Sequence, residues 1–164
     1  MITSPSVEDT AAATWILVAD RARARLFSIN RRAGRMIEFE DFVDPEARTP
    51  GHEPEHAPPP RVHDRVGEAR HAIEVHTSPR EKAALQFAAS LGSYLKHAHG
   101  RRRYREMVLI APPRFLGALN AALGAHVGET VLLRVAKNMV RLSASEIGEA
   151  LPHGLLKRCA VAGG

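Results

Sequence analysis

Two groups of arginines are the side chains of this sequence best suited to chemistry with a ligand. Arg21, Arg23 and Arg25 alternate with alanines and therefore share one face of a predicted strand. The second group surrounds the end of a predicted helix and consists of Lys96, Arg101, Arg102, Arg103 and Arg105. Clustered guanidinium groups can form bidentate hydrogen bonds with phosphate, so both groups are candidates for binding anions or nucleic acid. The alternative interpretations are a solvated sheet face and favourable charge at a helix C-terminus.

The carboxylates supply only part of a nuclease site. A nuclease that uses two magnesium ions needs several carboxylates that converge at strand ends. Asp20 follows the first predicted strand, and the other candidates, on predicted helices, are Glu81, Glu146 and Glu149. This set is incomplete, and in the alternative interpretation Asp20 turns the chain while the glutamates cap or solvate helices. We therefore do not expect a two-metal nuclease, and we assign no catalytic residue.

One segment matches a zinc-protease pattern only as text. Residues 52–56 are His-Glu-Pro-Glu-His, but the functional motif needs a regular helix that turns both histidines toward one metal ion. Pro54 lies between the histidines and three prolines follow at 58–60, so no such helix can form. A solvated loop is favoured over looser metal binding for the histidines of this region, which are His52, His56, His63, His71 and His76. We expect no metal and no cofactor, since the glycine-rich patterns GxxxxGK[ST] and GxGxxG are also missing.

Length and composition indicate one globular domain. Of the 164 residues, 45% are hydrophobic and 25% are charged, which excludes a wholly disordered or membrane-embedded protein. The formal net charge is +5, but the bias of 19 Arg against 4 Lys is as compatible with genome base composition as with phosphate binding. Cys159 is the single cysteine, so no intramolecular disulfide can form and a reducing compartment is expected. We expect Cys159 to be an inert thiol.

Neither an export signal nor a membrane span is expected. The apolar run at residues 11–19 is short, and it follows Glu8 and Asp9, where a signal peptide carries positive charge. No apolar stretch approaches the roughly 20 residues that are needed to cross a bilayer. We therefore predict a cytoplasmic protein.

The hydrophobic pattern predicts the strands. Residues 15–19 and 107–111 are apolar without alternation, which is typical of central strands covered on both faces. Residues 22–43 alternate around a turn-forming segment at 30–35 and predict a hairpin. Residues 130–135 are rich in β-branched residues and leucine and predict a last strand.

Capping signals predict the helices. Ser78 and Glu81 form a capping box, and Gly100 ends the helix that they open. A second helix is predicted at 115–125. Ser143 and Glu146 form a second capping box, which opens a short helix through residue 151.

Three strands are thus followed by helix, strand, helix, strand and helix. This order predicts a mixed sheet with helices on its faces, as in ribonuclease-H-like α/β folds. We expect a flexible tail at 1–13, a single domain at 14–151 and a second tail at 152–164. A long loop rich in proline and histidine, at 44–77, separates the third strand from the first helix.

Two long strings of the sequence resemble the bacterial host-attachment protein family. They are WILVADRARARLF at 15–27, which contains Asp20, and MVLIAPPRFLG at 107–117. Shorter similarities are GEARH at 67–71, FAASLGSYL at 87–95 and VAKNM at 135–139. In the last of these, the family usually has an acidic residue at the position of Asn138. The resemblance covers residues 14–151.

The resemblance implies a role in attachment to host cells and a distant similarity to the central domain of eukaryotic and archaeal peptide-chain release factors. That similarity implies a ribonuclease-H-like fold independently of the strand order. Such release factors hydrolyse peptidyl-tRNA through a Gly-Gly-Gln loop, but this sequence contains no such loop, and its single Gln is Gln86 in a predicted helix. Two hypotheses follow: a non-enzymatic protein that affects attachment by binding, indirectly from the cytoplasm, or a ribosome- or RNA-associated module without the catalytic loop.

The family string also places Arg114 where a buried strand turns into a helix. Ligands of open α/β sheets bind outside the carboxyl ends of strands, and helix N-termini favour anions, so Arg114 would face a phosphate or carboxylate. The alternative role of this string is structural. In that case Pro112 and Pro113 end the strand, Phe115 packs in the core, and Gly117 permits a close helix contact.

Overall fold

The computed structural model describes residues 13–30, 35–48, 77–152 and 154–156. The elements, in chain order, are β1 (Thr14–Ala19), β2 (Arg23–Asn30), β3 (Arg35–Val43), the 3-10 helix η2 (Pro45–Arg48), α1 (Pro79–Gly100), β4 (Glu106–Ala111), α2 (Pro113–Gly128), β5 (Val131–Ala136) and α3 (Ala144–Ala150). The histidines between 52 and 76, Cys159 and most of the predicted loop at 44–77 lie outside the described residues.

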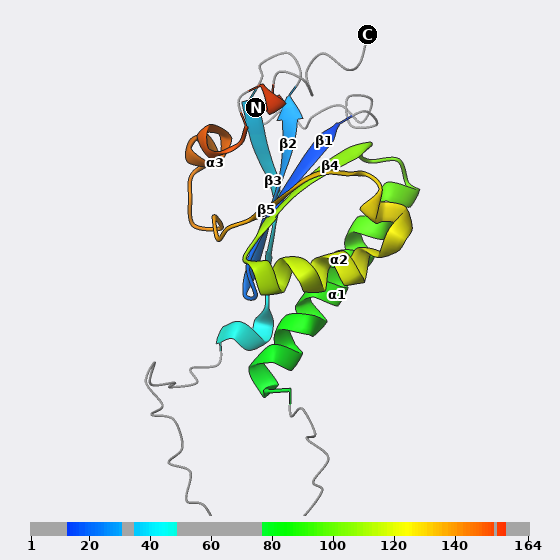
Figure 1. Cartoon of the computed structure of the whole chain (residues 1–164), viewed down its shortest axis with the longest axis vertical. Helices are drawn as coiled ribbons and strands as arrows, with labels where there is room; N and C mark the ends of the chain where they lie inside the picture. The colour runs from blue at the N-terminus through cyan, green and yellow to red at the C-terminus, as the bar shows by residue number, and fades with distance from the viewer. Residues whose placement is uncertain (1–12, 31–34, 49–76, 153, 157–164) are drawn as a thin grey trace, which may run out of the picture.

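The strands form one mixed sheet in the order β3-β2-β1-β4-β5. β2 is antiparallel to both of its neighbours, whereas β1 pairs parallel with β4 and β4 pairs parallel with β5. This topology confirms the predicted β-β-β-α-β-α-β-α order and the ribonuclease-H-like α/β fold. Figure 1 shows α1 and α2 together on one side of the sheet and α3 on the other.

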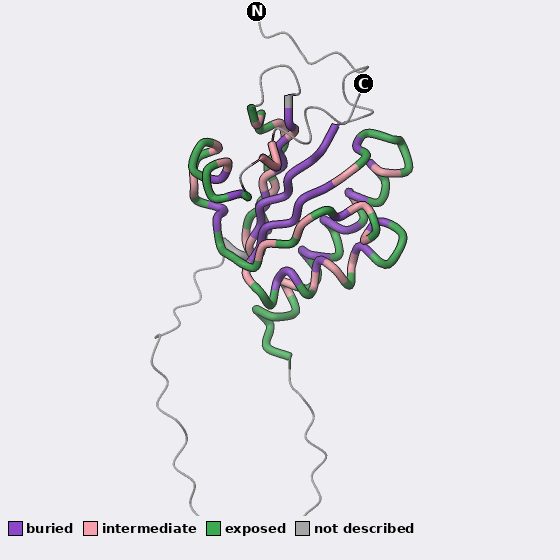
Figure 2. The backbone as a smooth tube through the Cα atoms, turned by 45° about the horizontal axis from the view of Figure 1, so that its top comes forward, coloured by how far each residue is buried: buried purple, intermediate pink, exposed green. Residues whose placement is uncertain are grey.

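β1 and β4 are the central strands, as their apolar sequences predict. All residues of β1 are buried, and β4 is buried from Met107 to Ala111. Figure 2 shows this continuous buried tract between the flanking layers. Each of the two strands has a hydrogen-bonded neighbour on both sides, so their side chains can avoid water only because helices cover both faces of the sheet.

Alternation along the central strands divides the core into two clusters. One set of side chains packs beneath α1 and α2 and includes Trp15, Leu17, Met107 and Leu109. The other packs on the α3 side and includes Ile16, Val18, Val108 and Ile110. Since successive residues of a strand point to opposite faces, a fully apolar strand supplies both clusters at once.

The helices begin where the capping signals predict. The Oγ of Ser78 accepts a hydrogen bond from the amide of Glu81 at 3.2 Å. At α3 the box is reciprocal, because Ser143 also donates its amide to Glu146 Oε2 at 2.7 Å. α2 runs past its predicted end at 125, but the positive φ of 69° at Gly124 interrupts its helical geometry there.

The close contact between helices is made by a different glycine from the one predicted. A Cβ on Gly117 would meet nothing within 4 Å among the described residues, so the proposed packing role of that glycine is wrong. A Cβ on Gly92 of α1 would instead lie 2.7 Å from the Cβ of Ala122 on α2. The absence of a side chain at position 92 therefore allows the two helices to pack closely.

Several described residues at the edges of the predicted tails and loop belong to the folded domain. Asp44 is buried, and η2 follows it inside the segment predicted as loop. Leu155 and Leu156, predicted to belong to a tail, pack against the core cluster on the α3 side. Within the described part of the chain, none of the helices is both long enough and apolar enough for a membrane span.

Candidate functional site

A cleft of about 610 Å³ opens at the carboxyl ends of the parallel strands. Its walls come from the turn after β1, the start of α1, the β4–α2 junction and the segment after β5. The lining residues are Asp20, Arg21, Ser78, Arg80, Glu81, Ala84, Leu85, Pro112, Arg114, Phe115, Ala118, Asn138 and Arg141. The cleft thus lies at the sheet edge where α/β folds bind ligands.

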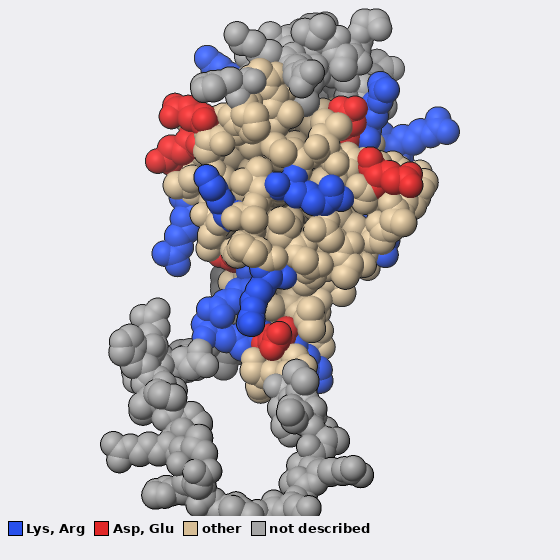
Figure 3. Space-filling view, viewed as in Figure 1, with Lys and Arg blue, Asp and Glu red and all other residues tan. Residues whose placement is uncertain are grey.

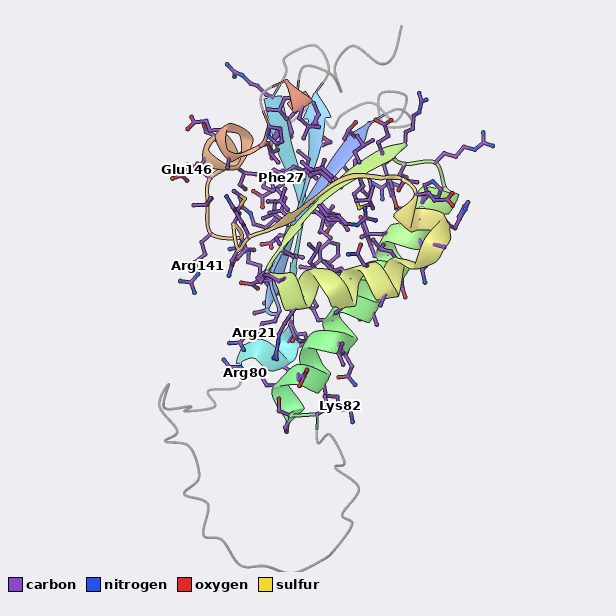
Figure 4. The ribbon with its side chains drawn as sticks, in the orientation of Figure 1. Arg21, Phe27, Arg80, Lys82, Arg141 and Glu146 are labelled. Atoms are coloured by element: carbon purple, nitrogen blue, oxygen red, sulfur yellow. The ribbon has the colours of Figure 1, made fainter. Side chains whose placement is uncertain are left out.

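Arginines from four separate segments line this cleft. Arg21 follows β1, Arg80 lies in the first turn of α1, Arg114 lies in the first turn of α2, and Arg141 follows β5. Figure 4 shows Arg21 and Arg80 near the lower end of the sheet, with Arg141 on the loop that leads to α3. In Figure 3, basic side chains gather below the sheet beside the start of α1, with an acidic group next to them. The topology therefore collects positive charge that is dispersed in the sequence.

A hydrogen-bonded turn sets the position of Arg21. The Oδ1 of Asp20 accepts hydrogen bonds from the amides of Ala22 and Arg23, at 2.8 and 2.9 Å. The amide of Asp20 donates to the carbonyl of Arg23 at 2.8 Å. Asp20 therefore turns the chain, as one interpretation of the sequence proposed, and it also lines the cleft.

Arg114 is exposed at the beginning of α2, on the wall of the cleft. Pro112 precedes the helix without a side-chain cap, and its carbonyl accepts from the amide of Leu116 at 2.8 Å. Phe115 is buried in the core, so the structural role proposed for it also holds. The string that turns β4 into α2 thus packs the core and presents a guanidinium to a concave surface.

One wall of the cleft is apolar. Leu85 of α1 remains 50% exposed, and Ala84, Phe115 and Ala118 line the cleft with it. The Phe115 ring stacks on the ring of Phe87, with centroids 6.0 Å apart. This stacking fixes the wall to the interface between α1 and α2.

The four carboxylates considered for metal binding are not brought together. Asp20 and Glu81 line the cleft, whereas Glu146 and Glu149 belong to α3, on the other side of the sheet (Figure 4). Asn138 lines the cleft as well, and its Oδ1 accepts from the amide of Val140 at 3.4 Å. Among the described residues, no group of three or more His, Cys, Asp or Glu side chains could hold a metal ion.

Arg23 and Arg25 do not join Arg21 at the cleft. Arg23 forms a bidentate ion pair with Asp41, at 3.0 and 2.8 Å, and the pKa of Arg23 is raised mainly by this hydrogen bonding. Arg25 forms a second bidentate pair with Glu38, at 2.8 and 2.7 Å, and this hydrogen bonding lowers the pKa of Glu38. Both pairs cross from β2 to β3.

The face that carries these pairs is not simply solvated, which corrects the interpretation of Arg21, Arg23 and Arg25 as one wet face. The Nη1 of Arg25 donates to the carbonyls of Val140 and Leu142, at 3.0 and 2.6 Å. Its guanidinium also lies 5.0 Å from the ring centroid of Phe27. The segment after β5 covers this face, so hydrophobic alternation in β2 alone could not show it.

The second basic group lies at the opposite end of α1. Arg101, Arg102, Arg103 and Arg105 are all exposed. Arg102 and Arg105 line a smaller cavity of about 440 Å³ together with His99 and His126, whose ring centroids are 5.4 Å apart. Arg103 lies 5.5 Å from the ring centroid of Trp15, and Arg102 has a left-handed φ of 55°. The turn after α1 therefore spreads these guanidinium groups over a surface separate from the cleft.

Sequence reasoning missed several of the cleft residues. Arg80 and Leu85 belong to a well-predicted helix, and Arg141 and Asn138 follow a predicted strand, but no local motif assigns any of them to a site. The available signal was topological: residues just after parallel strands and at the starts of the following helices meet at one edge of the sheet. A third cavity, of about 710 Å³ between β3 and α3, also had no sequence signal.

The fold and cleft together define a ribonuclease-H-like α/β domain with an arginine-lined cleft at the carboxyl edge of its parallel strands. Residues 15–151 match the family model described as "Protein required for attachment to host cells". This match covers most of the chain, and the protein therefore belongs to the host-attachment family.

Two solved structures resemble the chain at low identity. The crystal structure of the archaeal translation termination factor aRF1 is 11% identical, with a TM-score of 0.45, and the match covers 92% of this chain and 38% of that one. A structure described as an archaeal protein is 10% identical, with a TM-score of 0.44 and coverages of 92% and 36%. The chain thus spans less than two fifths of the length of either protein. No match was found among curated proteins.

Proposed function

We propose that this host-attachment family protein acts by binding an anionic ligand in the cleft at the carboxyl ends of β1, β4 and β5. The observation that carries the proposal is the convergence of Arg21, Arg80, Arg114 and Arg141 from four segments. Guanidinium groups arranged around a concave surface suit bidentate recognition of phosphate or carboxylate. Among the described lining residues, two carboxylates accompany the four arginines.

Binding is favoured over catalysis by the donor set of the cleft. Two-metal hydrolysis needs several converging carboxylates. Among the described lining residues these are Asp20 and Glu81, and one oxygen of Asp20 is already bonded to two turn amides. The amide of Asn138 stands where the resemblance leads one to expect an acidic group. This set supports charge recognition better than metal-assisted hydrolysis.

The role in attachment then follows indirectly. A protein that acts from the cytoplasm would influence attachment through the ligand that it binds, rather than by contacting the host cell itself. Cytoplasmic localisation is part of this proposal, and fractionation of the native cells tests it. Recovery of the protein at the cell surface would instead support direct contact with the host.

The experiment for the cleft compares two arginine variants. Titration calorimetry with inorganic pyrophosphate at low salt should detect binding to the unchanged protein. Arg114→Ala should weaken binding about tenfold or more, because a hydrogen bond to a charged group contributes roughly 1.5–3 kcal/mol. The matched control is Arg35→Ala, which removes an exposed arginine that lines the cavity between β3 and α3. No binding by the unchanged protein, or equal loss in both variants, would contradict the proposal.

A second candidate function is association with RNA or the ribosome through the basic group after α1. The exposure of Arg101, Arg102, Arg103 and Arg105 favours it. Each phosphate contact steepens the salt dependence of binding by nearly one unit of log-log slope for duplexes. Co-sedimentation with ribosomes should therefore be strong at low salt and weaken when residues 101–103 are all changed to Ala. Absence of co-sedimentation at low salt, or its persistence in the triple variant, would exclude this function.

A further inference from the structure

We infer that the ligand of the cleft is a nucleoside phosphate, either free or as a nucleotide unit of a single strand. The inference rests on the proposed anion-binding function and adds the chemical class of the ligand. It is drawn from three kinds of surface that meet in one cleft: arginines, an apolar wall and carboxylate acceptors. The volume of about 610 Å³ lies in the usual range for small-molecule sites.

The arginines account for the phosphate. Arg21, Arg114 and Arg141 come from different segments, so an anion placed among them can be contacted from several directions. Arg23 and Arg25 are close in sequence but are held by carboxylates of β3. The cationic part of the cleft is therefore distinct from the arginines that stabilise the sheet.

The apolar wall is not needed for binding a bare anion. Among the described residues, four large hydrophobic side chains are exposed, and Leu85 is the one that lines the cleft. Phe115 also lines the cleft and is fixed by stacking on Phe87. A planar base placed against this wall would bury the exposed part of Leu85 and gain hydrophobic stabilisation.

The two carboxylates of the cleft also favour a nucleoside phosphate over a small inorganic anion. Asp20 and Glu81 line the cleft, and they repel a small anion placed near them. Oδ2 of Asp20 and the carboxylate oxygens of Glu81 can accept hydrogen bonds from ribose hydroxyls or base amino groups, and the side-chain amide nitrogen of Asn138 can donate. A nucleoside phosphate supplies an anion, hydrogen-bond donors and an apolar ring in one molecule, so it satisfies all three surfaces.

The inference is tested by titrating the unchanged protein with the four ribonucleoside monophosphates, ribose 5-phosphate and inorganic phosphate. At least one nucleotide should bind tenfold or more tightly than ribose 5-phosphate. Leu85→Ser should weaken the binding of that nucleotide about fivefold, as expected for the loss of a partly buried leucine contact, and should leave phosphate binding unchanged. The matched control is Leu132→Ser on β5, because Leu132 is 49% exposed and Leu85 is 50% exposed.

The outcomes separate this inference from the proposed function. Equal affinity for nucleotide, ribose 5-phosphate and phosphate would overturn the nucleotide inference and leave the proposed anion binding intact. Unchanged nucleotide affinity in Leu85→Ser would have the same consequence. Binding of none of these anions would overturn both. A single-stranded RNA pentamer separates the two sources: tighter binding than the monophosphate supports a strand, and equal or weaker binding supports a free nucleotide.

Discussion

Replacing Arg25 should destabilise the domain far more than replacing Arg23, although both residues form bidentate ion pairs on β2. The side chain of Arg25 is 12% exposed, and it donates to Glu38 and to the carbonyls of Val140 and Leu142. Arg25→Ala therefore removes one ion pair and leaves two partly buried carbonyls without this donor. Hydrogen bonds to charged groups contribute roughly 1.5–3 kcal/mol, and removal of one partner from a buried pair costs about 3–5 kcal/mol.

Partial hydration of Glu38 offsets some of this loss, so we expect Arg25→Ala to lower the free energy of unfolding by about 3 kcal/mol. Arg23→Ala is the matched control. Its pair with Asp41 is 47% and 42% exposed, and exposed pairs contribute about 0.2–1 kcal/mol. Arg25→Lys should give an intermediate loss, because an ammonium keeps the charge without the planar fork of donors.

Urea unfolding followed by tryptophan fluorescence measures these differences. Trp15 is the single tryptophan and is fully buried in β1, so its emission reports exposure of the core. The midpoint should fall markedly for Arg25→Ala at an unchanged denaturant slope. A loss no greater than that of Arg23→Ala would refute the assignment of Arg25 as a structural arginine.

Two further predictions concern the free energy of unfolding. Gly92→Ala should destabilise the domain by about 1–3 kcal/mol, because the new Cβ would lie 2.7 Å from the Cβ of Ala122. Gly117→Ala should stabilise the domain by about 0.5–1 kcal/mol, because helix propensity rises and the new Cβ meets no described atom within 4 Å. Thermal unfolding of both variants checks that the two changes in stability have opposite signs. The pKa of Glu38 is lower in the folded protein than in the unfolded chain, where it is about 4.3, so its ion pair stabilises the fold at pH values above about 4.3. This stability is lost as the pH falls through the folded pKa. Glu38→Gln should therefore flatten this part of the acid dependence in urea titrations, and an unchanged slope would contradict the role of its pair with Arg25.

The fold was predictable because its decisive signals are local. The apolar runs of β1 and β4 indicate burial on both faces, and Ser78 and Ser143 mark helix starts through bonds to residues three positions away. Gly124 is also a local signal, because its positive φ interrupts α2 near the predicted end of the helix. Each of these features depends on neighbours within a few residues, which a single sequence contains.

The candidate site was only partly predictable because it is assembled over long distances. Arg114 was identified from its place after a central strand, but its partnership with Arg80 and Arg141 depends on how α1 and the segment after β5 meet the sheet edge. The assignment of Arg25 to the same group as Arg21 failed for a related reason. Val140 and Leu142, whose carbonyls accept hydrogen bonds from Arg25, are more than one hundred positions away in the sequence.

The two carbonyls bound by Arg25 flank Arg141 in the sequence. A guanidinium on the β2–β3 side of the sheet thus tethers the backbone on both sides of a cleft arginine. This tether restricts the backbone on either side of Arg141, so less ordering would be left for binding of the ligand that we propose for the cleft. Under that proposal, changes at position 25 would alter affinity through preorganisation, although Arg25 itself does not line the cleft.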